Sequence, residues 1–316
     1  MKTKRRQGRH LKGKKMKNHI TIDAMAKINL VLDVTGKRPD GYHELRMVMQ
    51  TVGLFDTLEF TRSEGVSIKT VSAKREKEDY SEEEFINRIG SPEKNLAYRA
   101  VCQLKEIYGC ADGLDIRLNK KIPIAAGLAG GSTDAAAAFE AANVLFGLGL
   151  SKEQLMEHAV GLGADIPYCI QKGTALAEGI GEKLTPLPKL PECSFLLVKP
   201  DIEVSTKWVY QNLKINEIEH HPDVEGMLMA IREGNLKNIA SHMENVLEQV
   251  TEKEYPVIST IKYEMRRNGA LNALMSGSGP TVFGLYSNME SALRAKAYFE
   301  NAYPAYDVFA VKPGYL

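Results

Sequence analysis

Cysteine is scarce in this sequence, and the four cysteines that it contains are widely spaced. Cys102, Cys110, Cys169 and Cys193 form no C-x-x-C pair, the spacing that is typical of zinc sites and redox-active dithiols. We therefore expect buried free thiols in a reducing cytoplasm, rather than a disulfide framework or a metal centre.

Long apolar runs and a dominant charge are missing too. No run of apolar residues approaches the roughly 20 that a transmembrane helix needs. The formal net charge of the 316 residues is +1, so the chain as a whole has no electrostatic attraction to nucleic acid or to acidic membranes. We expect a cytoplasmic monomer or homodimer that has neither a membrane nor a nucleic acid as its partner.

Residues 1–15 (MKTKRRQGRHLKGKK) are the exception to this balance, because they contain eight basic residues and no acid. They lack the hydrophobic core of a secretory signal. A basic, disordered leader is the expectation, with Met16 as an alternative start, and a nucleic-acid-binding arm stays open. Without this leader the remaining chain is mildly acidic.

The length is sufficient for two domains, each with a core of its own. Three prolines lie close together in residues 184–193 (LTPLPKLPEC), a composition that is typical of a connection between domains. We predict an N-terminal domain over residues 16–180 and a C-terminal α+β domain over residues 181–316.

Residues 123–138 (PIAAGLAGGSTDAAAA) are the most distinctive stretch of the chain. Three glycines among alanines precede Ser132 and Thr133, and the alanine run that follows favours a helix. A glycine-rich loop that enters a helix presents free N–H groups and the positive end of the helix dipole, which suits a phosphate. The loop matches neither the Walker A spacing nor the dinucleotide-binding spacing. The alternative is a tight turn with Ser132 as the N-cap.

Residues 20–34 alternate strictly between apolar even-numbered positions and other residues, which predicts a half-buried strand. Lys27 and Asn29 then lie together on the opposite face, where they either form part of a polar site or face solvent. A turn at residues 39–41 (PDG) follows and presents Tyr42 and His43. This aromatic pair suits a planar ligand, although a plain hairpin tip is the alternative.

Hydrophobic periodicity predicts most of the remaining elements. Residues 74–88 are charge-rich and are expected to form a solvated loop or a short surface helix. Asp165 comes shortly before Pro167, so it is expected on a loop or at a helix end, where a turn-forming role is the alternative to a catalytic one. Strands are expected at residues 47–60, 66–71, 114–118, 174–178, 195–198 and 306–311, helices at 95–109, 151–161, 224–248, 255–267 and 289–301, and a strand–glycine loop–strand unit at 271–286.

Three separated stretches resemble the motifs of the GHMP small-molecule kinases: residues 26–45 (AKINLVLDVTGKRPDGYHEL), 123–138 and 274–286 (LMSGSGPTVFGLY). Residues 163–170 (GADIPYCI) are similar to the segment that carries the catalytic aspartate of that family. The resemblance extends from about residue 17 to the C-terminus. It implies an α+β, two-domain fold with the active site in the interdomain cleft, ATP as co-substrate, Mg²⁺, and an alcohol as the phosphoryl acceptor. The first motif further implies that this acceptor is a small molecule carrying cytidine diphosphate.

The resemblance also implies roles for individual residues. Asp165 matches the catalytic aspartate, which is placed near the hydroxyl group that receives the phosphoryl group, and Lys27 matches the lysine beside it. A lysine keeps such an aspartate ionised and offsets the charge on the transferred group. On the substrate side, the implied binding residues are Asn29, Tyr42, His43, Tyr210, Gly277, Ser278 and Gly279. On the ATP side, they are Asn95, Lys120, Pro123, Ile124, Ala125, Ala126, Gly127, Leu128, Ala129, Gly130, Gly131, Ser132 and Thr133, with Ser132 also implied as a contact of Mg²⁺.

Three alternatives remain open at this point. A GHMP kinase for a sugar, a mevalonate derivative or homoserine is disfavoured by Tyr42 and His43, because these acceptors have no base on which the rings could stack. A non-catalytic nucleotide sensor is disfavoured because both Lys27 and Asp165 are present. An RNA-binding protein on the related N-terminal fold is disfavoured by the mildly acidic body of the chain. The one departure from the family pattern is Ala125–Ala126, where some relatives carry glycines.

Overall fold

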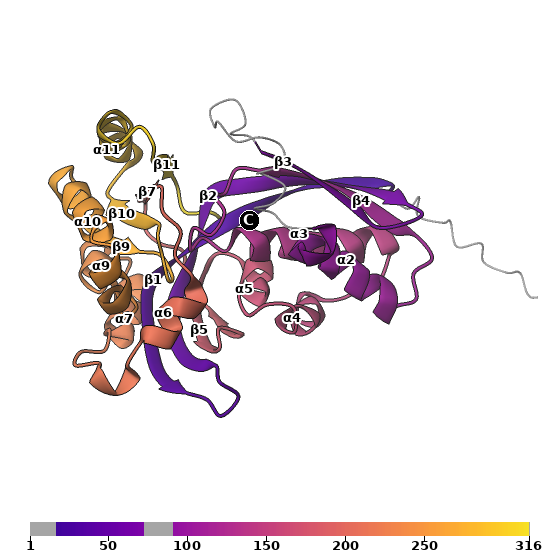
Figure 1. The fold of residues 1–316 in the computed structure, drawn as a ribbon, viewed down its shortest axis with the longest axis horizontal. Helices are drawn as coiled ribbons and strands as arrows, with labels where there is room; N and C mark the ends of the chain where they lie inside the picture. Colours follow the sequence, from indigo (N-terminus) through magenta and orange to yellow (C-terminus); the bar gives the residue numbers. More distant parts are fainter. Residues whose placement is uncertain (1–16, 73–90, 316) are drawn as a thin grey trace, which may run out of the picture.

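The computed structural model describes residues 17–72 and 91–315. Two sheets, each with its own helices, lie side by side in an elongated molecule (Figure 1). The predicted leader at 1–15 and the charge-rich insert at 74–88 lie outside the described residues.

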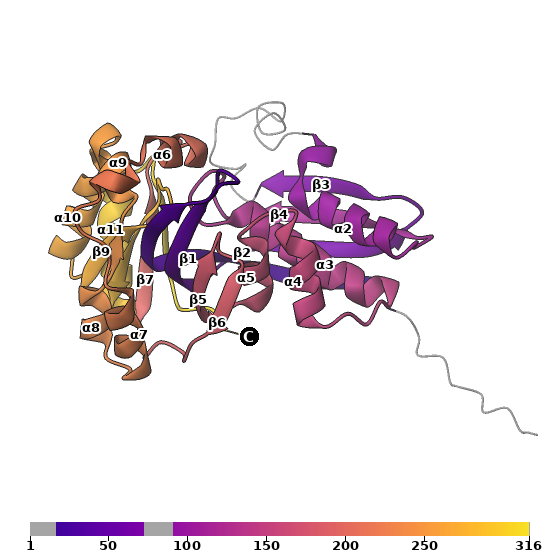
Figure 2. The same cartoon turned by 90° about the horizontal axis from the view of Figure 1, so that it is seen from below.

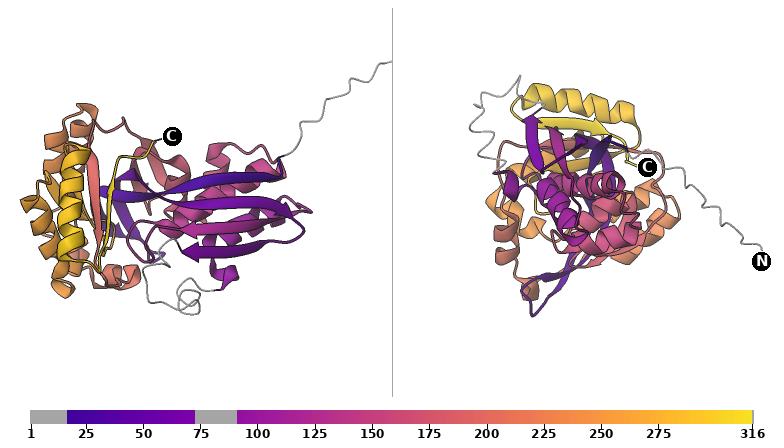
Figure 3. Two further views of the ribbon diagram at one scale, coloured as in Figure 1. Left: turned by 90° about the horizontal axis from the view of Figure 1, so that it is seen from above. Right: turned by 90° about the vertical axis from the view of Figure 1, so that its right-hand side faces the viewer.

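The first sheet contains seven strands within the described residues, and its main path runs β3-β4-β2-β1-β8. The hairpin of β1 and β2 is its longest part, and it extends from the second sheet to the far end of the molecule (Figure 3). β5 pairs with β2, and β6 pairs with β5. The strands are β1 (His19–Lys37), β2 (His43–Ser63), β3 (Ser67–Ser72), β4 (Gly113–Lys120), β5 (Thr174–Gly179), β6 (Lys183–Pro186) and β8 (Glu244–Asn245).

Helices cover one face of this sheet (Figures 1 and 2). Four consecutive alanines of α3, Ala135–Ala138, are buried, and their small side chains let α3 pack closely between β1 and α2. Helix α4 begins with a capping box, in which the side chains of Ser151 and Gln154 each accept the other residue's backbone N–H. The elements are a 3₁₀ turn η1 (Pro92–Lys94), α2 (Leu96–Ile107), α3 (Gly130–Phe146), α4 (Lys152–Val160) and α5 (Ile166–Gln171).

The second sheet is antiparallel, in the order β11-β7-β10-β9. Helix α11 packs on β7 and β11, and α10 packs on β9 and β10. The strands are β7 (Ser194–Lys199), β9 (Asn272–Met275), β10 (Val282–Tyr286) and β11 (Asp307–Val311). The helical elements are α6 (Thr206–Asn212), η2 (Ile215–Glu217), α7 (Val224–Arg232), α8 (Leu236–Ser241), α9 (Glu248–Glu254), α10 (Val257–Arg267) and α11 (Met289–Ala302).

The expected helix at 224–248 is wrong as one element. Gly234, with φ +64, ends the first helical segment and separates α7 from α8. The chain then forms β8, which pairs with β1 across the molecule. Because β6 and β8 belong to the first sheet, two strands from beyond residue 180 complete the N-terminal half, and the domain boundary stays a prediction.

The strict alternation expected for β1 is also wrong in detail. Register shifts lie between Met25 and Lys27 and between Asn29 and Val31, so the strand is bulged on both sides of its Lys-Ile-Asn segment. As a result, the alternating face is divided between two cores. Ala24, Leu32 and Val34 belong to one core, and Ala26, Ile28 and Leu30 belong to the other.

The four cysteines are free thiols, as expected, but only two are buried. Cys169 and Cys193 lie in the interior, whereas Cys102 and Cys110 are partly exposed on and after α2. No helix within the described residues has both the length and the apolar character needed to cross a bilayer.

Candidate active site

A cleft of about 470 Å³ lies where β1, the glycine-rich loop after β4 and the loop after β9 meet. A second, wider hollow of about 1330 Å³ adjoins it on the side of the β1–β2 hairpin and α6. Asp165, Ser132, Thr206 and Tyr210 line both spaces. The two hollows therefore meet at Asp165, the residue that immediately precedes α5.

Lys27 and Asn29 do not face solvent. Lys27 is 6% exposed and Asn29 is fully buried, and the Lys27 ammonium donates a hydrogen bond of 2.9 Å to Asn29 Oδ1. Asp165 Oδ2 lies 3.7 Å from Lys27 Nζ. Pro167 sits in the first turn of α5, where its missing N–H costs no hydrogen bond, so Asp165 falls at the start of a helix. The structure thus brings together the lysine and aspartate that the resemblance pairs.

The glycine-rich loop passes under the cleft and enters α3. Helix α3 begins at Gly130, and its N-cap is Ala129, so Ser132 lies inside the first turn and is not the N-cap. Ala125 and Ala129 adopt left-handed conformations with φ +52 and +55, which are uncommon for residues other than glycine. The loop is also tied to β1, because the Lys27 N–H donates to the Leu128 carbonyl at 3.2 Å.

Three residues of the predicted binding set line neither hollow. Leu128 is buried, and its contribution is the carbonyl that binds β1. Thr133 donates from its hydroxyl to the Met25 carbonyl at 2.7 Å, which anchors α3 to β1. Gly279 closes a turn by donating its N–H to the Ser276 carbonyl. These residues shape the loops and do not line the cleft.

Lys120 lines the cleft, but its ammonium is held by two buried carboxylates. Its Nζ lies 2.5 Å from Asp56 Oδ2 and 2.7 Å from Asp134 Oδ2. Asp56 also accepts the N–H groups of Lys121 and Ile122 through Oδ1, at the point where β4 ends and the loop begins. Sequence reasoning missed both aspartates. Asp134 had one local signal, since it directly follows the glycine loop, whereas Asp56 lies far away on β2.

Burial and the neighbouring Asp56 raise the pKa of Asp134 to about 7 from 3.8, although Lys120 opposes the shift. The folded chain therefore binds more protons here than the unfolded chain between about pH 4 and pH 7. The stabilisation of the folded state that comes from this difference in proton binding is complete below pH 3.8, and it is lost as the pH rises toward 7.

We accordingly expect Asp134→Asn, which cannot ionise, to flatten the dependence of the free energy of unfolding on pH across that window. Denaturant melts at several pH values measure this dependence. Asp115→Asn removes an exposed carboxylate on β4 and is the control, for which the wild-type slope is expected. An unchanged slope in Asp134→Asn would show that Asp134 does not titrate in this range.

Aromatic rings line the wider hollow. The rings of His43 and Tyr210 lie 4.9 Å apart between centroids, at an interplanar angle of 34°, and Tyr42 is 58% exposed beside them. Burial and the nearby Lys37 lower the pKa of His43 below its ordinary value, so its ring is neutral at pH 7. Tyr210 is brought here by α6, a helix that the periodicity did not predict.

Asn95 lines the cleft at its far side, next to Lys94. Its side-chain oxygen accepts the Ala97 N–H at 2.9 Å, so it is the N-cap of α2. Its amide nitrogen is the part that remains for a ligand.

Comparison with known proteins identifies the family. Residues 95–173 match the GHMP kinases N terminal domain, and residues 227–305 match the GHMP kinases C terminal domain. A 4-diphosphocytidyl-2-C-methyl-D-erythritol kinase of Lachnoclostridium phytofermentans is 49% identical over 278 residues, which are 87% of this chain and 91% of the relative. The chain belongs to this kinase family. A second member, from Lachnospira eligens, is 46% identical over 93% of this chain and 98% of its own length.

Solved structures agree with this assignment. The crystal structure of a 4-(cytidine 5′-diphospho)-2C-methyl-D-erythritol kinase superposes with a TM-score of 0.75 at 31% identity, over 93% of this chain and 100% of the other. A homoserine kinase from Cytophaga hutchinsonii superposes with a TM-score of 0.74 at 20% identity, over 96% of this chain and 98% of the other, which shows a common fold alone. The predicted α+β GHMP kinase fold is confirmed, and the kinase is a phosphotransferase with an alcohol as acceptor and ATP as co-substrate.

The described residues contain no group of three or more histidine, cysteine, aspartate or glutamate side chains placed to hold a metal ion. Ser132 lines both hollows, and no hydrogen bond within the described residues uses its hydroxyl. A metal that is bound mainly through phosphate oxygens needs few protein ligands of this kind. The predicted contact of Ser132 with Mg²⁺ is compatible with this geometry and stays a prediction.

Proposed function

We propose that this kinase transfers the γ-phosphoryl group of ATP to the 2-hydroxyl group of 4-diphosphocytidyl-2-C-methyl-D-erythritol, in the non-mevalonate (MEP) route to isoprenoid precursors in the cytoplasm. The observation that carries the proposal is the position of the Lys27–Asp165 pair, at the junction of the narrow cleft and the aromatic hollow. Two substrates that enter from these two sides meet at this pair.

The narrow cleft is the ATP side of the proposal. The loop at residues 123–133 and the N-terminus of α3 offer backbone N–H groups and a positive dipole end to the phosphates. Asn95 and Lys94 lie farther along the cleft, where the adenine is proposed to bind. Lys120 acts indirectly on this side, since its ammonium is paired with Asp56 and Asp134 beneath the loop.

Asp165 is proposed to accept a hydrogen bond from the 2-hydroxyl group and to orient its oxygen toward the γ-phosphorus. The new bond joins that oxygen to phosphorus, the bond between phosphorus and the β,γ-bridging oxygen breaks, and ADP leaves. The hydroxyl proton passes to Asp165 and then to solvent. Because phosphoryl transfer has a loose transition state, positioning contributes more than early removal of this proton. Lys27 offsets the negative charge on the transferred group.

Mg²⁺ is proposed to bind with ATP, with Ser132 as its contact on the protein, and would neutralise charge on the phosphates. On the acceptor side, Tyr42, His43 and Tyr210 are proposed to hold the cytosine. A neutral His43 suits an uncharged base, because its ring both stacks and hydrogen-bonds without carrying a charge into the hollow. Gly277 and Ser278 line the cleft next to Asn29 and are proposed to face the erythritol.

The test is a phosphorylation assay in which the purified kinase is offered ATP, Mg²⁺ and one of four acceptors. We expect turnover of the diphosphocytidyl substrate, with galactose, mevalonate and homoserine at background, and a product phosphorylated at O2 by ³¹P NMR. Faster turnover of mevalonate or homoserine would overturn the proposed acceptor. Transfer to a different hydroxyl group of the same substrate would overturn the placement of Asp165.

A further inference from the structure

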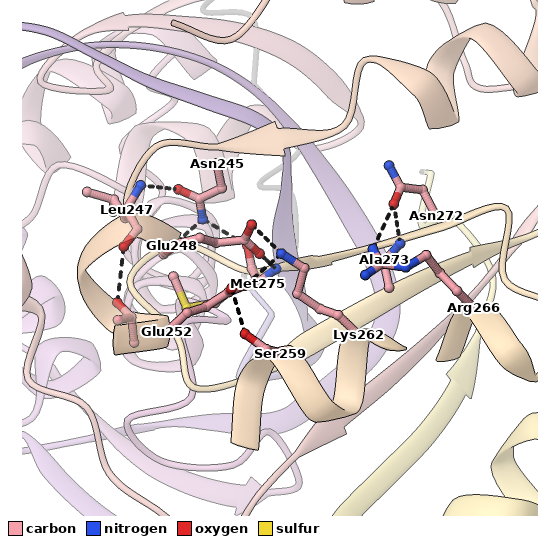
Figure 4. A network of polar contacts seen from close by, with 12 residues as sticks. Asn245, Leu247, Glu248, Glu252, Ser259, Lys262, Arg266, Asn272, Ala273 and Met275 are labelled. Atoms are coloured by element: carbon pink, nitrogen blue, oxygen red, sulfur yellow. Dashed lines mark hydrogen bonds and ion pairs between the residues drawn. The ribbon is translucent and has the colours of Figure 1, made fainter. Parts of the chain in front are cut away.

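Asn245 is fixed between the catalytic strand and the loop after β9. It is 3% exposed and lies on β8, where its backbone pairs with Leu32 of β1. Its side-chain amide donates to the carbonyls of Met275 at 2.9 Å and Gly277 at 2.8 Å, and its Oδ1 accepts the Leu247 N–H at 3.0 Å (Figure 4). Both amide hydrogens and the carbonyl oxygen of the Asn245 side chain therefore take part in hydrogen bonds.

The contacts form a closed path through the active site. β1 carries Lys27 and Asn29, β8 pairs with β1, and Asn245 of β8 holds the Gly277 carbonyl. A Cβ atom placed on Gly277 would lie 3.6 Å from Asn29 Oδ1 and 3.7 Å from Lys27 Nζ, so the loop returns to the same strand. The position of this loop over Lys27 is thus set by Asn245.

The direction of the Gly277–Ser278 peptide follows from this anchor. In a trans peptide the carbonyl and the N–H point in opposite directions. Since Asn245 binds the Gly277 carbonyl, the Ser278 N–H points away from Asn245. Ser278 is 5% exposed, yet no hydrogen bond within the described residues uses its N–H. Polar backbone groups of buried residues are rarely left without a partner, and Ser278 lines the cleft, so a ligand in the cleft can supply the acceptor.

A second contact holds the start of this loop, at Met275. Glu248 of α9 accepts the Met275 N–H at 2.7 Å, and Lys262 of α10 donates to Glu248 at 2.5 Å and to Glu252 at 2.6 Å (Figure 4). Met275 is therefore held on both sides, through its carbonyl by Asn245 and through its N–H by Glu248. A loop fixed in this way loses little conformational freedom when a ligand binds.

We propose that Asn245 is a positioning residue of the phosphoryl-transfer site. It turns the Gly277–Ser278 peptide so that the Ser278 N–H donates a hydrogen bond to an oxygen of the acceptor substrate, beside Lys27 and Asn29. This inference rests on the proposed function for the identity of the acceptor, and on the geometry of the loop for everything else.

Asn245→Asp tests the inference, because it keeps the size of the side chain and places a carboxylate against two carbonyl oxygens. Asn272→Asp is the matched control. Asn272 also donates from its amide to one backbone carbonyl, that of Ala240 at 2.7 Å, but it lies at the start of β9 and lines neither hollow. Its Oδ1 accepts the Ala273 N–H at 2.8 Å and a longer hydrogen bond of 3.4 Å from Arg266. We expect Asn245→Asp to lower kcat/KM for the acceptor by about tenfold or more, with KM for ATP nearly unchanged. A loss of this size is typical when a hydrogen-bond donor is replaced by a group that cannot donate.

The rate of Asn245→Asp relative to the wild type is expected to rise as the pH falls, since a protonated carboxyl group again donates one hydrogen bond. A purely structural role would lower the stability of the variant without this pH profile or the selective change in KM. Asn245→Ala removes the donors without adding charge, and it serves if the aspartate variant does not fold. Kinetic constants of the Asn245 variants that match those of Asn272→Asp would overturn the inference.

A readout without substrate separates this inference from the proposed function. Amide hydrogen exchange of residues 274–281 is expected to be faster in Asn245→Asp than in Asn272→Asp. If the wild type leaves the diphosphocytidyl substrate unphosphorylated, the proposed function fails and hydrogen exchange alone decides the inference. If the wild type is active but exchange in this segment equals that of the control, the inference fails and the function stands.

Discussion

Replacing Asp165 by asparagine is expected to lower kcat by about 10²-fold or more, equivalent to roughly 2.7 kcal/mol of transition-state stabilisation. The asparagine keeps the shape of the side chain but removes the charge that pairs with Lys27 at 3.7 Å and that is proposed to orient the acceptor hydroxyl. Substrate binding depends on the two hollows as a whole, so KM should change much less than kcat. Steady-state kinetics with both substrates, together with a melting curve, measure the two effects.

Lys27→Met is expected to have a loss of kcat of similar size, about 10²-fold. If Lys27 and Asp165 act as one unit, the double variant should be hardly slower than the poorer single variant. Because Lys27 is buried and its ammonium is hydrogen-bonded to Asn29, the melting temperature of the Lys27→Met variant is also expected to fall. A near-native kcat in Asp165→Asn would contradict the mechanism and support a turn-forming role.

Two variants control for the chemistry of these substitutions. Asp23→Asn removes a carboxylate from the exposed part of the same strand, where it accepts a hydrogen bond from Thr57 at 2.9 Å. Lys121→Met removes an exposed ammonium that lies 5.2 Å from the Phe55 ring centroid. Both residues line neither hollow, so wild-type kcat is expected for each.

The parts of the site that could be predicted from sequence are those with a local signal. The glycine-rich loop, the turn before Tyr42 and His43, and the position of Asp165 near Pro167 are all encoded within a few residues. The structure brings Lys27 and Asp165 together, but only the family resemblance paired them in advance. Lys27 and Asp165 are far apart in the sequence, and nothing in their spacing shows that this strand meets this helix start.

The parts that were missed depend on contacts distant in the sequence. Asp56 accepts the backbone N–H groups of Lys121 and Ile122, and the amide nitrogen of Asn245 donates to the carbonyls of Met275 and Gly277, so the contacts that matter for the site lie far away in the sequence. A buried aspartate on a strand is indistinguishable in sequence from an exposed one. Only the fold reveals that Asp56 and Asn245 form hydrogen bonds with remote groups.

Periodicity failed where tertiary pairing outweighed it. The bulges of β1 place Lys27 and Asn29 toward the cleft, whereas an ideal strand would leave the usual solvent-exposed lysine. The expected helix at 224–248 is interrupted because β8 pairs with β1, a contact that no local propensity encodes. Both departures shape the candidate site, since they position β1 and Asn245.

The close packing of the two glycine loops predicts a large effect for Gly127→Ala. Gly127 has φ +73, and a Cβ atom there would lie 2.3 Å from the Ser276 carbonyl oxygen and 2.9 Å from that of Gly279. Backbone atoms cannot move aside as a flexible side chain does. The substitution must therefore separate the glycine-rich loop at residues 123–133 from the loop after β9, and break the hydrogen bond of 3.0 Å from Ser276 Oγ to the Gly127 carbonyl.

We expect Gly127→Ala to lower the melting temperature by about 4 °C or more, from a destabilisation of about 2 kcal/mol. Its affinity for ATP, measured by calorimetry well below the melting temperature, is expected to fall by about tenfold or more. Gly131→Ala is the control for stability, since its Cβ would only reach ordinary contact, 3.6 Å from Leu96 Cδ1, in a helix that favours alanine. A Gly127→Ala variant with the wild-type melting temperature and ATP affinity would show that the two loops move independently, and that the cleft does not depend on their contact.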